Sequence, residues 1–197
     1  MKILMVFVLD NLLGNLYQKM LTMRFIIILL FLPLKGITQL SYETIKMPKS
    51  VEETSGLELF GDYLITHNDS GDKPKLYTIN QKGEKIMEIE LNQLKNIDWE
   101  DITADSENFY IADTGNNYAT RENLKIYILD KDFFLKGTIS IRYEAQTTFS
   151  REPKNEFDAE ALAVIGDRLV LFSKNRKTLK SEIYSFPKIA GDYILTP

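Results

Sequence analysis

One phrase, Asp98-Trp99-Glu100-Asp101-Ile102, occurs three times in this chain in related forms. An acidic residue comes first, a polar or acidic residue stands two positions later, and an aliphatic residue ends the phrase. The other two copies are Glu53-Thr54-Ser55-Gly56-Leu57 and Asp158-Ala159-Glu160-Ala161-Leu162. Strand-like segments follow each copy, and a repeat of about 45 to 60 residues with about four short strands is typical of β-propeller blades.

Each repeat divides into short apolar or alternating segments separated by turn residues. The first repeat predicts strands at 57–60, 63–67, 75–80 and 85–91, and the second predicts strands at 101–104, 109–113, 124–129 and 138–143. The third predicts strands at 161–165, 169–173 and 182–186, with the start of a fourth at 193–195. Gly61-Asp62 and Gly166-Asp167 mark tight hairpins between the first two strands of their repeats.

The sequence therefore predicts an all-β fold, a β-propeller fragment of nearly three four-stranded blades from a six-bladed ring. Propellers close with about four to eight blades, so this number leaves strand edges and apolar faces open. We expect the remaining blades in a missing second half of the protein. The alternative is an open stack of sheets that self-associates through its open blades with a second copy.

The composition excludes several kinds of site. There is no Cys, so disulfides and thiolate metal sites are excluded, and the single His67 argues against a multi-histidine zinc site. Without the four basic residues and one Asp of residues 1–38, the chain carries 20 basic and 27 acidic residues, a net charge of -7. Such a domain is unsuited to nucleic acid and better suited to a cation, a small molecule or an extended ligand.

The N-terminal segment has the pattern of an export signal. Residues 25–34 are apolar and follow Arg24, a run of about ten residues that is too short to span a membrane and typical of a signal peptide. We expect a signal peptide at 1–38 with an over-extended start, a linker at 39–52, blades at 53–197, and a periplasmic or secreted product without stable membrane insertion. The alternatives are an amphipathic helix of the fold and an uncleaved membrane anchor.

The repeated phrase also predicts a metal site. In a propeller the first strand of each blade lines the central channel, and carboxylates at its mouth repel one another unless a cation lies among them. Ca²⁺ takes about six to eight oxygen ligands from such side chains. The expected ligands come from the three phrases and from the loop after 109–113: Glu53, Asp98, Glu100, Asp113, Asn116, Asp158 and Glu160. Alternatively, these carboxylates cap turns at the entry of each blade.

His67 is the one candidate for catalysis. Paired with Asp69 or Asp113, it would act as a general base. The loop that follows, Asn68-Asp69-Ser70-Gly71, is rich in residues that favour turns and that ligate cations through oxygen.

Several blocks together carry a resemblance to known proteins: Thr66-His67-Asn68-Asp69-Ser70-Gly71, the Asp98–Ile102 phrase, and Ile111-Ala112-Asp113-Thr114-Gly115-Asn116-Asn117 with Arg121. Over residues 50–190 they resemble a family of secreted six-bladed propellers of Bacteroidetes-type bacteria, mostly uncharacterised. More distantly, the chain is similar to the senescence-marker/gluconolactonase and calcium-dependent phosphotriesterase propellers. That resemblance implies calcium on the central axis, bound by Glu, Asn and Asp side chains.

Three functions remain open from the sequence. The first is an exported propeller that binds a ligand at an acidic, calcium-loaded central site. The second is a calcium-dependent lactonase or phosphoesterase-like hydrolase. The third is a metal-free scaffold for protein interactions.

Overall fold

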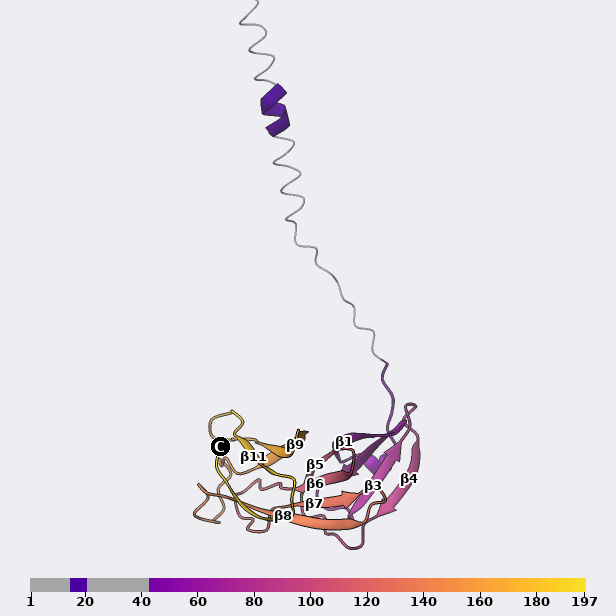
Figure 1. Cartoon of the computed structure of the whole chain (residues 1–197), viewed down its shortest axis with the longest axis vertical. Helices are drawn as coiled ribbons and strands as arrows, with labels where there is room; N and C mark the ends of the chain where they lie inside the picture. Colours follow the sequence, from indigo (N-terminus) through magenta and orange to yellow (C-terminus); the bar gives the residue numbers. More distant parts are fainter. Residues whose placement is uncertain (1–14, 21–42) are drawn as a thin grey trace, which may run out of the picture. The chain divides into compact units, whose positions relative to one another are not determined.

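The computed structural model describes residues 15–20 and 43–197 and divides into two units, Met1–Glu43 and Thr44–Pro197 (Figure 1). In the first unit, residues 15–20 are helical. Among the described residues, none of the helices has the length and apolar character needed to cross a membrane. Apart from residues 15–20, the predicted signal peptide lies outside the described residues, as does the linker up to residue 42.

The second unit is all-β, as the sequence predicts, and its strands form three sheets. The first sheet follows a short 3-10 helix, Lys49–Val51, and contains β1 (Thr54–Phe60), β2 (Tyr63–Asn68), β3 (Lys75–Ile79) and β4 (Lys85–Glu90). The second contains β5 (Trp99–Ala104), β6 (Asn108–Asp113), β7 (Lys125–Asp130) and β8 (Leu135–Tyr143). The third contains β9 (Ala159–Ile165), β10 (Arg168–Ser173) and β11 (Ile183–Pro187). Consecutive strands within each sheet are antiparallel neighbours.

The last strand, β12 (Gly191–Leu195), corrects one prediction. Residues 193–195 do not begin a fourth strand of the third sheet; β12 instead pairs in parallel with β8, at the outer edge of the second sheet. Just before β12, Lys188 Nζ donates to Asp105 Oδ2, in the turn between β5 and β6, at 2.7 Å. The sheets therefore have four, five and three strands, and residues 44–197 form no closed ring.

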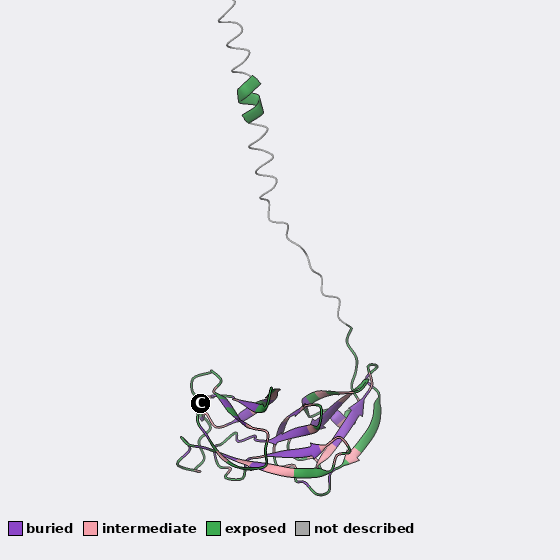
Figure 2. Ribbon diagram, viewed as in Figure 1, coloured by how far each residue is buried: buried purple, intermediate pink, exposed green. Residues whose placement is uncertain are grey.

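Much of the strand backbone belongs to buried residues, drawn in purple in Figure 2. The buried apolar residues form clusters that join neighbouring sheets. One core cluster joins the first and second sheets through residues such as Ile65, Trp99 and Phe109. Another joins the second and third sheets through residues such as Ile126 and Leu171. The three sheets are thus stacked face to face, each packing on the next in chain order.

The first strands of the sheets lie side by side, because β1 contacts β5 and β5 contacts β9. In each sheet, a residue that follows the second strand donates its backbone N–H to the carbonyl oxygen of the residue before the first strand. These bonds run from Asp69 to Glu53 (2.9 Å), from Gly115 to Asp98 (3.2 Å) and from Lys174 to Asp158 (2.6 Å). The acidic residues that open the three phrases are therefore structurally equivalent, and so are the three donors.

Candidate functional site

Five carboxylates gather where the neighbouring first strands begin. They form two overlapping groups that share Glu100: Asp69, Asp98 and Glu100 in the first, and Glu100, Asp158 and Glu160 in the second. Within each group, one oxygen atom of every residue lies within 4.8 Å of the others. Four of the seven ligands predicted from the sequence are thus brought together, and Asp69 joins them.

Cationic side chains occupy the second group. Asp158 is fully buried, and its Oδ2 accepts hydrogen bonds from Arg176 Nε at 2.9 Å and Nη2 at 2.7 Å. Its Oδ1 accepts from the backbone N–H of Asn116 at 2.8 Å. Glu160 accepts from Lys174 Nζ at 2.7 Å. The oxygen atoms of Asp158 are therefore already engaged, and they are poorly placed to serve as metal ligands.

The first group differs because its charges are not paired. Within residues 43–197, no Lys or Arg nitrogen lies within ion-pair distance of Asp69, Asp98 or Glu100. Apart from Asp69 Oδ1, which accepts from the Ser70 backbone N–H, the carboxylate oxygen atoms of these partly buried residues are available to a cation. This is the donor chemistry that a hard divalent cation requires.

The protonation of the first group reflects this crowding. Burial, together with repulsion from Glu160, Asp69 and other carboxylates, raises the pKa of Glu100 to about 9. Burial also raises the pKa of Asp98 to about 6, and the neighbouring Asp69 adds to that shift. Without a cation, Glu100 therefore holds a proton at neutral pH. A bound dication would reverse this preference, because it stabilises the ionised carboxylate.

Gly115 keeps the space between two of these carboxylates free. A Cβ atom at this position would lie 2.3 Å from Asp98 Oδ2 and 2.3 Å from Glu100 Oε1, well inside van der Waals contact. Any side chain at residue 115 would therefore displace both carboxylates from their present positions. The second repeat needs a glycine here for the two carboxylates to converge.

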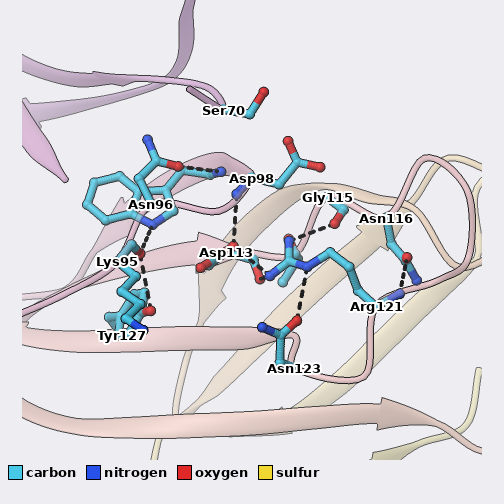
Figure 3. Close-up of polar contacts among 12 residues, drawn as sticks. Ser70, Lys95, Asn96, Asp98, Asp113, Gly115, Asn116, Arg121, Asn123 and Tyr127 are labelled. Carbon is cyan, nitrogen blue, oxygen red and sulfur yellow. Dashed lines mark hydrogen bonds and ion pairs between the residues drawn. The ribbon is translucent and has the colours of Figure 1, made fainter. Parts of the chain in front are cut away.

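Asp113 and Asn116, both predicted as ligands, instead position their neighbours (Figure 3). Asp113 is fully buried, and its Oδ1 accepts from Arg121 Nη2 at 2.8 Å and from the backbone N–H of Asp98 at 3.1 Å. Arg121 also donates from Nη1 to the carbonyl oxygen of Gly115 at 2.7 Å. Asn116 Oδ1 accepts from the Arg121 backbone N–H at 2.9 Å. This network fixes the residue before β5, Asp98, against the loop that carries Gly115.

Glu53, another predicted ligand, also lies outside the carboxylate groups. Glu53 is exposed and belongs to neither group, although it is the structural equivalent of Asp98. In the first repeat, Ser55 takes the position of Glu100, and its hydroxyl donates to the Glu100 carbonyl oxygen at 2.7 Å.

His67, the predicted general base, is buried in the core. Its side chain is fully buried, Nδ1 lies 3.0 Å from the Asn68 carbonyl oxygen, and the ring meets the Trp99 indole edge-on at 5.5 Å. Burial lowers the pKa of this imidazole. The ring is fully enclosed in this arrangement, and the role of His67 as a general base stays a prediction.

The predicted ligands include neither Asp69 nor Gly115, although the sequence marks the loop of Asp69 as one that can ligate cations. A signal for both was present, since each follows the second strand of its repeat, where the third repeat has Lys174. Aligned on the ends of these strands, Asp69 and Lys174 share a position with Thr114, and Gly115 stands one residue later. The backbone hydrogen bond to the acidic phrase is what makes Asp69, Gly115 and Lys174 equivalent. The residue that donates this bond contributes a negative charge, no side chain and a positive charge in successive repeats.

Comparisons with known proteins give little further information. No protein-family model matches the chain, and no curated protein matches it significantly. Among solved structures, the computationally designed Ika4 protein is similar with a TM-score of 0.42 and 9% sequence identity, over 80% of this chain and 78% of that one.

Proposed function

We propose that this protein is an exported propeller-type protein that binds Ca²⁺ at Asp69, Asp98 and Glu100, and that the loaded site binds a small or extended ligand. One observation carries the proposal. These three carboxylates converge within 4.8 Å of one another, and no Lys or Arg of residues 43–197 pairs with them. The second group, with its cationic partners, serves as a built-in contrast.

The propeller arrangement is part of the proposal. In its favour are three successive sheets that stack face to face, first strands that lie side by side, and an equivalent hydrogen bond in each sheet. In such an arrangement the carboxylates lie at the mouth of a central channel, where propellers commonly hold their ligands. Export rests on the apolar run at 25–34.

Calcium suits the donor set better than a transition metal does. All three proposed ligands are carboxylates, and hard oxygen donors favour Ca²⁺ or Mg²⁺ over Zn²⁺ or Cu²⁺. Ca²⁺ takes about six to eight oxygen atoms, more than three carboxylates supply in simple contacts. Water, or oxygen atoms of a ligand, would complete the coordination. A ligand rich in hydroxyl, carboxylate or phosphate oxygens is therefore the expected class.

Calcium binding can be measured as stabilisation. At a Ca²⁺ concentration about 100 times the dissociation constant, the free energy of unfolding should rise by about 2.7 kcal/mol. Asp98→Asn should remove most of this gain, because it takes one carboxylate from the first group. The matched control is Asp132→Asn, since Asp132 is exposed in the turn between β7 and β8. Urea unfolding with Ca²⁺ and with EDTA gives both values.

A third variant separates the two groups. Asp158→Asn should destabilise the protein with and without Ca²⁺, yet retain the calcium-dependent gain, because Asp158 is bound to Arg176 and Asn116. If unfolding is the same in Ca²⁺ and in EDTA for the unaltered protein, the carboxylates hold no calcium. The hydrolase alternative depends on the same metal and would fall with it.

A further inference from the structure

A cavity of about 530 Å³ lies at the outer edge of the second sheet, where β12 pairs with β8. It is lined by β7, β8 and β12 and by the loop that precedes β7. None of its lining residues belongs to the two groups of carboxylates. Cavities of about 300 to 1,000 Å³ commonly hold small molecules, so this one has the size of a second binding site.

Strand register arranges the side chains of this cavity in two rows. Lys125 of β7, Ser140 of β8 and Asp192 of β12 are register partners and form the first row. Arg142 and Ile194 are partners in the second row, two residues further along β8 and β12. Register partners, and residues two apart in a strand, share one face of a sheet, so all five side chains lie on the same face. The opposite face of these strands packs against the third sheet.

The charges in the cavity do not neutralise one another. Lys125, Arg142 and Asp192 line it together with Glu122 from the loop before β7. Within residues 43–197, none of these four side chains forms an ion pair. Two positive and two negative groups thus face one cavity, and both signs are available to a bound molecule.

The loop wall of the cavity is held in place by Arg121. Its Nε donates to Asn123 Oδ1, which belongs to the lining, at 3.2 Å (Figure 3). Its other nitrogen atoms donate to Asp113 Oδ1 at 2.8 Å and to the Gly115 carbonyl oxygen at 2.7 Å. The wall is therefore ordered before a ligand arrives, which lowers the entropy lost on binding.

We propose that this cavity binds a small zwitterion with one carboxylate and one ammonium group, the chemistry shared by free amino acids and short peptides. The carboxylate lies over Ser140 and accepts from Lys125 and Arg142, and the ammonium group donates to Asp192. Glu122 repels a second anionic group, so the cavity discriminates against polyanions. The proposal does not rest on the calcium site.

The spacing of the first row sets the length of the ligand. Neighbouring strands lie about 4.8 Å apart, so the backbones that carry Lys125 and Asp192 are about 10 Å apart. An extended chain advances about 3.3 Å per residue, and about three residues therefore cover this distance. Ile194 is 62% exposed beside Arg142 and offers an apolar contact to a small side chain. A tripeptide with small side chains matches these features.

Calorimetric titration of the full chain with four probes tests the proposal. The probes are trialanine, L-alanine, N-acetyl-trialanine, which lacks the ammonium group, and trialanine amide, which lacks the carboxylate. EDTA is present throughout, so the outcome does not depend on calcium. Trialanine should bind, and each modified peptide should bind about fivefold more weakly, because it loses one ion pair. Tighter binding of trialanine than of L-alanine identifies a peptide as the ligand, and the reverse identifies a free amino acid.

Two variants assign the contacts. Arg142→Gln should remove the preference for trialanine over its amide while leaving the preference over the N-acetyl form. Asp192→Asn should do the opposite. Both side chains are exposed, so circular dichroism should stay unchanged. The matched control is Asp132→Asn, which is exposed in the turn between β7 and β8, lies outside the cavity and should keep both preferences.

Three outcomes would overturn the proposal. Absence of heat with both trialanine and L-alanine shows that the cavity takes no zwitterion. Equal affinity for all three peptides shows that neither terminal charge is recognised. Preferences that survive in both variants place the binding site elsewhere on the protein.

Discussion

The two groups of carboxylates share Glu100 but differ in how the repulsion between their negative charges is compensated. Around Asp158 and Glu160, the chain supplies its own cations, Arg176 and Lys174. Around Asp69 and Asp98, no Lys or Arg of residues 43–197 forms an ion pair, and the neighbouring Arg121 pairs with Asp113 instead. Like charges at such distances are tolerated only if a proton, a side chain or an ion compensates them. The second group is therefore complete within the chain, whereas the first requires something from solution.

The difference arises at one equivalent position in the repeats. Asp69, Gly115 and Lys174 make the same backbone hydrogen bond, yet they contribute a negative charge, an open space and a positive charge. The three repeats thus share a backbone hydrogen bond but differ in the side chain at that position. The bond involves backbone atoms alone, so it leaves the side chain free to vary. The following variants act on this contrast.

The largest effect is expected when the second group loses its main cation. Arg176→Met leaves Asp158 buried beside Glu100 and Glu160 with no ion pair of its own. Removing one partner of a buried ion pair costs about 3 kcal/mol or more, since the remaining charge stays desolvated. Urea unfolding should show this loss. The matched control is Lys174→Met, which should cost less than about 1 kcal/mol, because half of the Lys174 side chain is exposed.

An intermediate effect is expected from pH in the presence of EDTA. The folded-state pKa of Glu100 is raised to about 9, so the folded protein holds a proton that the unfolded chain has released above its ordinary pKa of 4.5. The raised pKa of Glu100 makes its whole contribution to the free energy of unfolding below pH 4.5, and this contribution is lost as the pH rises toward 9. The melting temperature should therefore fall over that window, and Glu100→Gln should flatten the fall. A profile that is equally steep in this variant would show that another group titrates.

A smaller effect is expected from one added methyl group. Gly115→Ala places a carbon where it collides with the Asp98 and Glu100 carboxylates, while leaving every ligand in the sequence. Calcium affinity should fall by about tenfold, which corresponds to about 1.4 kcal/mol. Calorimetric titration measures it directly. Unchanged affinity would mean that calcium does not lie between these two side chains.

Much of the fold follows from local sequence patterns. Alternation and turn residues placed all twelve described strands within a few residues of their bounds, because such signals depend on near neighbours. The destination of β12 was not predictable, because strand pairing across the sheets depends on distant partners. Nothing in Tyr193-Ile194-Leu195 distinguishes pairing with β11 from pairing with β8.

The site was predicted in part for the same reason. The repeated phrase led to Asp98, Glu100, Asp158 and Glu160 because they occupy repeated positions. The same phrase also predicts Glu53 as a ligand, but Glu53 is exposed. Within the described residues, no sheet precedes the first repeat to enclose that side chain. Which carboxylates have a counter-ion depends on loop residues such as Arg176, and their reach across the site is a property of three-dimensional structure.

The return of β12 to β8 has a mechanical consequence. All of β9, β10 and β11 lie in a stretch of chain whose two ends are fastened together by the ladder from Gly191↔Ile139 to Leu195↔Tyr143. The Glu144 N–H also donates to the Leu195 carbonyl oxygen at 3.0 Å, which locks the end of that ladder. A force applied to the chain beyond Leu195 would have to shear these parallel strands before it reached the third sheet. Five residue pairs between β12 and β8 thus hold together the two ends of the segment that contains the third sheet.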